Sequence, residues 1–446
     1  MSEDLSATTL LLIGAGPKSL AVAAKATVLR ELGLPAPRVT IVEPHTTGSN
    51  WTMVGGRTNG TLRLGTSPEK DLGFPYTSSC YGDLDREVDM RMQRFSWVTY
   101  MVETGRYADW VDRSRPSPRH AQWAEYLVWA ASRAEFDRVR GWVRAFDIEN
   151  GQWCVNIDPG TSDPVDRMFD HVMVTGPGPL LQRFREGGIC SLEEFWRFGL
   201  DLADVADPTV AVIGGGETAA AIVEQLTELR CRDITCVTPK PVLYSRGEGY
   251  FENAIYSSPE KWTTLTDAER RELVARTDRG VFSVRSLRCA VEDGRLRHLQ
   301  GRVVSCSSLD GKVQLGLRNE GRADESASFD IVIDGTGSGP HWFVDLLGGR
   351  VKERFVELAG GDPVEAFLER SMANDLSIGP LEPKLFVPSL AGHAQGPGFA
   401  NLSCLGLLAD RVLEGVSGSK VLAESVPTSS EQLSTHNSAR RDGNEF

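Results

Sequence analysis

Apolar and small residues follow one recognisable order near the start of the chain. The run Thr9–Ile13 is short and apolar, as expected for a strand buried in a parallel sheet. A turn rich in small residues follows at 14–19, and the alanine-rich stretch 20–32 has helical character. The run 38–42 is again mostly apolar, and Glu43 comes directly after it. This order predicts a strand, a glycine turn, a helix and a second parallel strand, which together form a βαβ unit.

The same order recurs near the middle of the chain. Thr209–Ile213 is the apolar run, 214–219 is a second glycine turn, 220–229 continues as a helix, and 234–237 is the next strand. Two βαβ units separated by roughly two hundred residues indicate a repeat at the level of the fold, not a solenoid of short repeats.

Two further apolar segments resemble each other, and each lies downstream of one βαβ unit. Residues 169–176 and 329–337 both start with Phe-Asp and end in Thr and Gly, where a nucleotide-binding domain would close its sheet. We therefore predict an α/β fold with two Rossmann-like dinucleotide-binding domains, the second inserted into the first. The predicted boundaries are 1–204 and 335–426 for the first domain, 205–334 for the second, and 427–446 for a polar, disordered tail. Because the second domain is joined by two connections, we expect it to rotate as a rigid body.

The composition is that of an ordinary globular protein, and it excludes several classes of partner. The 446 residues suit two or three domains, with 41% hydrophobic and 24% charged residues. A net charge of −13 without a basic cluster argues against a nucleic-acid partner. The apolar stretch 10–13 is too short to span a bilayer, and no signal-peptide pattern is present. We therefore expect a cytoplasmic protein with no membrane partner.

The first glycine turn has the residues that a dinucleotide needs. Gly14 allows a tight turn, and Gly16 removes a Cβ where the pyrophosphate approaches the backbone. Ser19 takes the third position and is small enough for the helix to pack on the strand. Glu43 lies where a carboxylate can accept hydrogen bonds from ribose hydroxyls. This context favours a nucleotide site over the alternative, a tight turn in an unrelated sheet, and we assign FAD to it.

The second glycine turn, Gly214-x-Gly216-x-x-Ala219, has the same context but no acid after its second strand. Without that carboxylate nothing repels a 2′-phosphate, and Lys240 or Arg246 could neutralise one. NADPH is therefore favoured here, with NADH still possible, and solvated surface positions remain the alternative for both cations.

Cysteine usage narrows the flavin chemistry. The eight cysteines are scattered without a CxxC pair, which indicates reduced thiols in the cytosol and no zinc site. A flavoprotein disulfide reductase needs a cysteine pair shortly after the first βαβ unit, and only Cys80 lies there. A flavin oxygenase needs no such pair, because the reduced cofactor and O₂ supply the oxidant.

Five motifs carry a resemblance to a known family. Up to about Leu422 the chain is similar to the class B flavin-dependent N-hydroxylating monooxygenases, the siderophore lysine and ornithine hydroxylases. Among these it is most similar to the L-lysine N6-monooxygenases of mycobactin and nocobactin biosynthesis. The motifs are Gly14-Ala-Gly-Pro17-Lys18, Gly65-Thr-Ser-Pro-Glu-Lys70-Asp-Leu-Gly-Phe-Pro75, Gly214-Gly-Gly-Glu217-Thr218-Ala-Ala220, Arg246-Gly-Glu-Gly-Tyr-Phe-Glu-Asn253 and Gln395-Gly-Pro-Gly398-Phe-Ala-Asn-Leu402-Ser403-Cys-Leu-Gly-Leu-Leu408.

The resemblance implies roles for residues outside the glycine turns. Lys70 of the Lys-Asp-Leu motif would contact the α-carboxylate of an amino-acid substrate, and Asn253 of the Phe-x-Asn motif would hydrogen-bond the same substrate. Asp278 or a neighbour stands where relatives carry an Asn that touches both NADP and substrate. Ser403 would contact flavin or substrate, with a helix N-cap as the equal alternative. Trp51 aligns with an aromatic residue near the flavin, and a core tryptophan is the competing interpretation.

The remaining implied assignments complete the site. The segment of about 246–285 would form a small substrate-binding region in the second domain. The predicted cofactor-binding residues in the family motifs are Pro17, Lys18, Glu217, Thr218, Gly398 and Leu402. No side chain is predicted to be catalytic, because the flavin carries the chemistry.

The implied reaction is hydroxylation of the side-chain amine of L-lysine to N6-hydroxylysine by a C4a-hydroperoxyflavin, with NADPH and O₂ consumed. The amine must be neutral to react, and an apolar pocket would lower its pKa from about 10.4. Lysine and ornithine differ by one methylene, so residue spacing alone does not separate them. The alternatives are an ornithine or other diamine hydroxylase, an uncoupled NAD(P)H oxidase and a non-catalytic nucleotide sensor. A homo-oligomer, dimer or tetramer, is left open.

Overall fold

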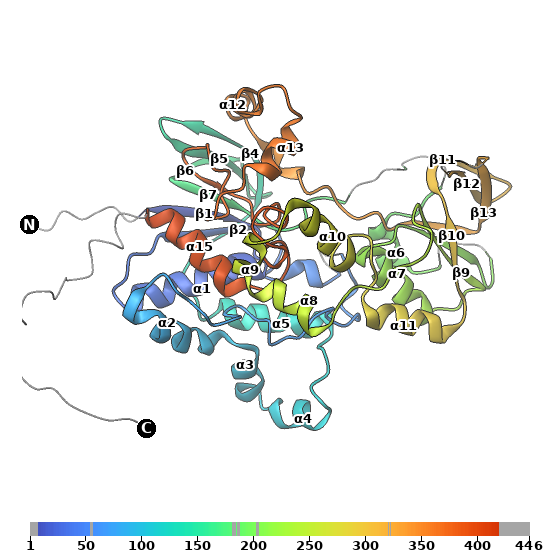
Figure 1. Cartoon of the computed structure of the whole chain (residues 1–446), viewed down its shortest axis with the longest axis horizontal. Coiled ribbons are helices and arrows are strands. Elements are labelled where there is room, and N and C mark those ends of the chain that lie inside the picture. The colour runs from blue at the N-terminus through green and yellow to red at the C-terminus, as the bar shows by residue number, and fades with distance from the viewer. Residues whose placement is uncertain are drawn as a thin grey trace, which may run out of the picture.

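A computed structural model describes residues 8–53, 57–180, 184, 188–201, 205–319, 321 and 323–418. The predicted tail, 427–446, lies outside this part of the chain. Figure 1 shows one unit around β1, β2 and β7 and a second around β9 and β10, with α8–α10 between them.

The first unit is built on a five-stranded parallel sheet in the order β15-β7-β1-β2-β3. The strand β1 is almost completely buried and pairs with β2 and β7. Its helix α1 starts at Pro17, three residues before the predicted start, because proline suits the first helical position. The bounds are β1 Thr9–Ile13, α1 Pro17–Glu31, β2 Arg38–Glu43, β3 Asp137–Arg140, β7 His171–Val174 and β15 Leu385–Phe386.

The second unit repeats this plan with a four-stranded parallel sheet in the order β10-β9-β8-β14. The helix α7 follows β8 directly through the second glycine turn. The bounds are β8 Thr209–Ile213, α7 Glu217–Thr227, β9 Asp233–Thr238, β10 Leu296–Gln300 and β14 Ile331–Asp334.

Each unit also carries a three-stranded antiparallel sheet just before its closing strand. In both units the Phe-Asp pair stands at the junction between the antiparallel sheet and the closing strand. Asp170 accepts hydrogen bonds from the backbone N–H and hydroxyl of Thr9, and Asp330 does the same for Thr209. The repeat predicted from the sequence therefore extends to matching side-chain contacts. The bounds are β4 Trp142–Glu149, β5 Gln152–Asp158, β6 Val165–Phe169, β11 Arg302–Leu309, β12 Lys312–Arg318 and β13 Glu325–Phe329.

After β14 the chain returns to the first unit. There β15 pairs with β7, and α15 packs on α1. The predicted fold class, two Rossmann-like domains with the second inserted into the first, is confirmed by these pairings together with the order of the parallel strands. The elements of the return are η4 Trp342–Leu346, α12 Gly349–Ala359, α13 Val364–Arg370, α14 Pro397–Ala400 and α15 Leu405–Ser417.

Helices between β2 and β3 cover one side of the first unit around a buried aromatic cluster. The rings of Trp97, Trp123 and Tyr126 pack on one another there. The bounds of these helices are η1 Ser49–Trp51, η2 Gly82–Leu84, α2 Asp85–Met92, η3 Gln93–Phe95, α3 Trp97–Glu103, α4 Tyr107–Asp112 and α5 His120–Ala131. Helix α6, Leu192–Phe198, lies between β7 and β8. Within the described ranges, none of the helices combines the length and apolar character needed to cross a membrane.

Helices between β9 and β10 reach from the second unit to the first. The indole N–H of Trp262 donates to the carbonyl of His393 at 2.8 Å. A Cβ on Gly398 would lie 2.0 Å from the carbonyl oxygen of Tyr256, so α8 and α14 touch closely. The bounds are α8 Tyr250–Ser257, α9 Pro259–Thr263, α10 Asp267–Thr277 and α11 Val284–Asp293.

Candidate functional site

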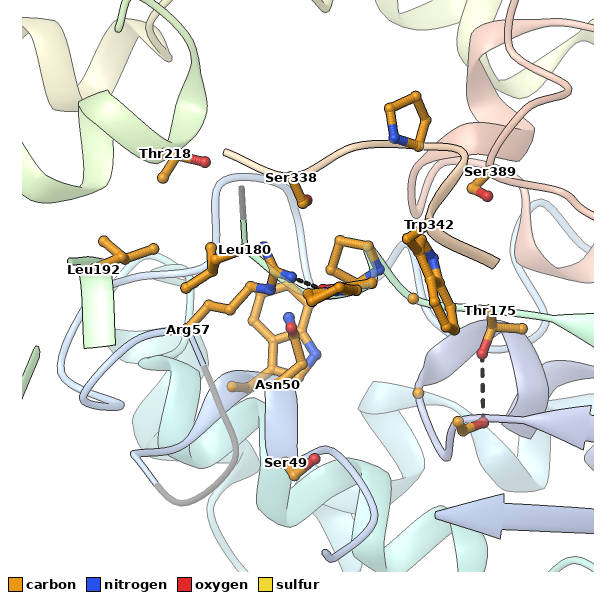
Figure 2. Close-up of a pocket in the computed structure, with 18 of the residues that line it drawn as sticks. Ser49, Asn50, Arg57, Thr175, Leu180, Leu192, Thr218, Ser338, Trp342 and Ser389 are labelled. Atoms are coloured by element: carbon orange, nitrogen blue, oxygen red, sulfur yellow. Dashed lines mark hydrogen bonds between the residues drawn. The ribbon is translucent and has the colours of Figure 1, made fainter. Parts of the chain in front are cut away.

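An open cleft of about 1790 Å³ lies between the two units. Its walls come from the first glycine turn, the end of β2, the loop after β7, the first turn of α7 and the Ala400–Leu402 loop. Figure 2 shows Ser49, Asn50 and Thr175 on the side of the first unit and Thr218 on the side of the second. The cleft therefore connects the two glycine turns that the sequence assigned to two nucleotides.

The first glycine turn presents bare backbone to this cleft. Gly14 has φ +95°, and a Cβ there would lie 3.0 Å from the Thr175 hydroxyl. Gly16 is the N-cap of α1, and a Cβ there would meet nothing within 4 Å. The Ser19 hydroxyl lies 3.2 Å from that of Thr175 and fixes the helix on the strand end. The free N-terminal N–H groups of α1, behind Pro17, can therefore receive a pyrophosphate.

Glu43 and Lys18 hold the shape of this turn. The Glu43 carboxylate accepts from the backbone N–H of Ala15 at 3.1 Å and of His45 at 3.0 Å, and it lines the cleft. The Lys18 ammonium donates to the carbonyl of Ala400 at 2.6 Å, and burial lowers the pKa of Lys18 to about 8. Glu43 thus fixes the turn at the end of β2, and Lys18 joins the turn to the loop that carries Leu402.

Trp51 supports the assignment of a bound group to the cleft. Its ring packs edge-on against His120 with 4.9 Å between centroids, and this contact fixes the position of the indole in the cleft wall. Its indole N–H is buried and lacks a hydrogen-bond partner among the described residues. A buried N–H donor without a partner is costly, and a cofactor acceptor in the cleft would satisfy it. The bare glycines and this free donor together fit a dinucleotide such as FAD.

Two residues that line the cleft were not identified from the sequence. Arg57 is half-buried, donates to the carbonyl of Gly178, and has its pKa lowered to about 10 by burial. Trp342 packs against the same glycine so closely that a Cβ on Gly178 would collide with the indole (Figure 2). Arg57 lies in a loop, Trp342 starts the short helix η4, and neither belongs to a motif, so no periodicity or spacing could have predicted them.

The second glycine turn forms its own recess of about 320 Å³ beside the cleft, and Glu217 and Thr218 line both. Gly214 has φ +132°, and a Cβ there would lie 2.6 Å from the carbonyl oxygen of Gly335. Gly216 is the N-cap of α7 and faces Gly280. This arrangement repeats the first turn and fits a second nucleotide.

The three residues predicted to bind substrate through the Lys-Asp-Leu, Phe-x-Asn and C-terminal motifs meet at one point. The Lys70 ammonium donates to Asn253 Oδ1 at 3.2 Å and to the Ser403 hydroxyl at 3.5 Å. Asn253 is itself held by the carbonyls of Glu248 and Gly249, to which its amide donates. Burial lowers the pKa of Lys70. Ser403 follows Leu402, which lines the cleft, so this cluster stands beside the cleft wall.

Other predicted residues lie in different places. Ser403 is not a helix N-cap, because α15 starts at Leu405 and its cap residue is Cys404. Asp278 lines the cleft at the end of α10, and burial raises its pKa. Gly398 is buried against Tyr256 and, unlike Leu402, is absent from the cleft wall. No group of metal-ligating side chains occurs among the described residues.

Asp71 fixes the loop that carries Lys70. Its carboxylate is almost completely buried and accepts hydrogen bonds from the Tyr76 hydroxyl at 2.7 Å and from the N–H groups of Gly73 and Trp97. Burial raises its pKa to about 6 despite these donors. The position of the Lys70 ammonium therefore depends on a carboxyl group that is costly to ionise.

We predict that Asp71 makes stability depend on pH. The folded-state pKa of Asp71 lies above the ordinary value of 3.8. The contribution of this group to the free energy of unfolding is therefore complete below about pH 4 and is lost as the pH rises through 6. Compared with Asp71→Asn, which does not titrate, the wild type should lose about 2 kcal/mol of unfolding free energy between pH 4.5 and 7.5. Urea unfolding of both proteins measures this, with the exposed Asp163→Asn as control. A pH-independent difference between wild type and Asp71→Asn would contradict the prediction.

Comparisons with known proteins find similarity to one family. The family model described as L-lysine 6-monooxygenase/L-ornithine 5-monooxygenase matches residues 90–292. L-lysine N6-monooxygenase MbtG of Mycobacterium sp. (strain MCS) is 46% identical over 412 residues, which cover 91% of this chain and 94% of that protein. The protein of the same name from Mycobacterium tuberculosis is 42% identical over 411 residues, which cover 91% of this chain and 94% of that protein.

Solved structures extend the likeness to the fold. Lysine monooxygenase NbtG from Nocardia farcinica, described as having an unprecedented NADPH domain conformation, is 44% identical with a TM-score of 0.80, and the match covers 91% of this chain and 100% of that one. An ornithine N-hydroxylase of Kutzneria sp. 744 is 18% identical with a TM-score of 0.73, covering 92% and 99%, and shares the fold.

Proposed function

The chain belongs to the L-lysine 6-monooxygenase/L-ornithine 5-monooxygenase family, and on this premise we propose that it converts L-lysine to N6-hydroxylysine for hydroxamate siderophore biosynthesis. FAD is its resident cofactor, NADPH its reductant and O₂ its second substrate. The relatives that are named lysine monooxygenases and match the chain over nine-tenths of its length support this assignment.

The observation that carries the proposal is the meeting of Lys70, Asn253 and Ser403 beside a cleft that joins both glycine turns. An ammonium group within hydrogen-bonding distance of both an amide and a hydroxyl matches the α-carboxylate and α-amino group of a free amino acid. The side chain of such a substrate would extend from this cluster toward the cleft, where the flavin would be bound.

The residues of this chain bind, orient and shield, and the bound flavin supplies the redox chemistry with NADPH and O₂. Gly14, Gly16 and Glu43 would hold FAD, while Gly214, Gly216 and Thr218 would hold NADPH. Lys70 would anchor the substrate at its carboxylate end. The lysine side-chain amine must lose its proton to react, and its removal from water in the cleft favours the neutral form.

The proposal also includes a cytoplasmic location. All eight cysteines lie in the described part of the chain, and the structure shows no disulfide between them. Reduced thiols fit a reducing compartment.

Product analysis with two amino acids tests the proposed function. Purified protein with FAD and NADPH should form the hydroxylated amine from L-lysine, and the kcat/KM for L-ornithine should be at least about 10-fold lower, because one methylene is worth about 1–3 kcal/mol. Equal product formation from both amino acids would refute a strict preference for lysine. Product from ornithine alone would assign the chain to the other substrate class.

A further inference from the structure

The guanidinium of Arg246 connects parts of the chain that are distant in sequence. It donates to the carbonyl of Gly65 at 2.9 Å, and Gly65 opens the motif that carries Lys70. It lies 3.4 Å from the carboxylate of Glu217, the first residue of α7, and 2.8 Å from that of Glu248. An arginine suits this position because its planar group offers five donors in a fixed geometry.

These contacts continue into the substrate cluster. The backbone carbonyl of Glu248 accepts from the Asn253 amide at 2.8 Å, and Asn253 Oδ1 accepts from Lys70. A continuous chain of polar contacts thus runs from Glu217, beside the second glycine turn, through Arg246 and Glu248 to the Lys70 ammonium. Arg246 also holds the Lys70 loop from its other end, through Gly65.

Lys240 is placed differently. It comes two residues after β9 ends, which is where the ribose of a nucleotide lies in this fold. Its ammonium donates to the carbonyls of Gly280 at 2.9 Å and Arg279 at 3.4 Å, and Gly280 faces Gly216 of the second turn. Unlike the Arg246 guanidinium, this ammonium forms no ion pair with a carboxylate of the described residues, so its charge is available to a phosphate.

We propose that Arg246 is a positioning residue for the lysine subsite, and that Lys240 is the cation that recognises the NADPH 2′-phosphate. The charge of Arg246 is balanced by Glu217 and Glu248. Its donors hold the loops that carry Lys70 and Asn253 in a fixed position relative to each other. This inference rests on the proposed function, because it takes L-lysine as the ligand of the cluster and NADPH as the ligand of the second turn.

Calorimetric titration of the oxidised holoenzyme separates the two roles without turnover. Arg246→Met should raise the Kd for L-lysine at least about tenfold and leave the Kd for NADP⁺ within about threefold, because two loops of the subsite lose their common support. Lys240→Met should do the reverse, weakening NADP⁺ at least about tenfold with little change for lysine. Arg246→Lys should restore part of the lysine affinity, since an ammonium can bond one of the carboxylates but cannot span all three partners.

Other outcomes would overturn the inference. If Arg246→Met weakens NADP⁺ and leaves lysine binding unchanged, Arg246 is a phosphate ligand. If it changes neither affinity, Arg246 positions nothing in the subsite. The ion pairs of Arg246 are partly exposed and contribute little to stability, so the variant should fold, and Glu248→Gln provides a second way to weaken the same contacts. Failure of the wild type to bind L-lysine would instead refute the proposed function.

Discussion

Replacing Gly16 by valine should give a folded protein that no longer retains flavin. Gly16 has φ −88° and ψ −179°, which valine adopts without strain, and a Cβ there meets nothing within 4 Å. The added side chain would project into the cleft where the first glycine turn offers its backbone to a pyrophosphate. We expect the flavin content to fall at least about 10-fold, and hydroxylation to fall with it, because removing the close approach costs more than about 1.4 kcal/mol.

The matched control for this variant is Gly349→Val. Gly349 also stands at the start of a helix, is exposed, and has no atom within 4 Å of its Cβ position, but it is not among the residues that line the cleft. Absorbance of the purified proteins measures the flavin per chain, and circular dichroism verifies the fold. Full flavin content in Gly16→Val would show that the first turn does not hold the cofactor.

Replacing Lys70 by alanine should raise the KM for L-lysine by about 30- to 1000-fold and leave the reduction of flavin by NADPH nearly unchanged. This rise in KM corresponds to about 2–4 kcal/mol of binding free energy, the loss expected when a half-buried site loses a charge-assisted contact with a carboxylate. The Lys70 ammonium contacts Asn253 and Ser403 and none of the glycine-turn residues, so the nucleotide sites should remain intact.

The control for Lys70 is Lys261→Ala, which removes an exposed lysine of α9 in the same substrate-binding region. Steady-state kinetics with varied lysine and anaerobic stopped-flow reduction by NADPH measure the two properties separately. Loss of both in Lys70→Ala would mean that Lys70 stabilises the structure, and an unchanged KM would remove it from the substrate site.

The parts of the fold that could be predicted are those with strong local patterns. The strands Thr9–Ile13 and Thr209–Ile213 have the predicted bounds, because fully buried parallel strands are continuous apolar runs between turns. The closing strands after Phe169 and Phe329 were also predicted from the sequence. The antiparallel sheets were not, since several of their strands are mostly exposed or half-buried and resemble ordinary surface segments.

The candidate site was predictable only through the family motifs. Lys70 and Asn253 are 183 positions apart, and Lys70 and Ser403 are 333 apart, so no local pattern shows that they meet. The family resemblance named them, and the structure places them together. Arg57 and Arg246 have contacts that depend on several loops at once, which explains why the sequence missed the first and associated the second with a phosphate.

The rotation of the second unit stays a prediction, and the structure names the contacts that it must break. The Asn59 amide donates to Gln225 Oε1 at 3.1 Å, and Arg285 and Arg246 donate to the carbonyls of Arg63 and Gly65. A rigid-body motion must also break the Trp262–His393 and Lys70–Asn253 hydrogen bonds and the packing of α8 on α14. Scattering curves of the holoenzyme that are identical with and without NADP⁺ would count against the rotation.

The central claim is that NADPH, O₂ and L-lysine react in one cleft, with one oxygen atom passing to the amine and the other, reduced at the expense of NADPH, to water. The stoichiometry of the reaction under ¹⁸O₂ tests this claim most directly. With saturating L-lysine, the purified holoenzyme should form one N6-hydroxylysine for each NADPH and each O₂ consumed, and the product should carry one ¹⁸O atom. Oxidation of NADPH with hydrogen peroxide as the product, and no labelled hydroxylysine, would contradict the account and identify the chain as an uncoupled oxidase.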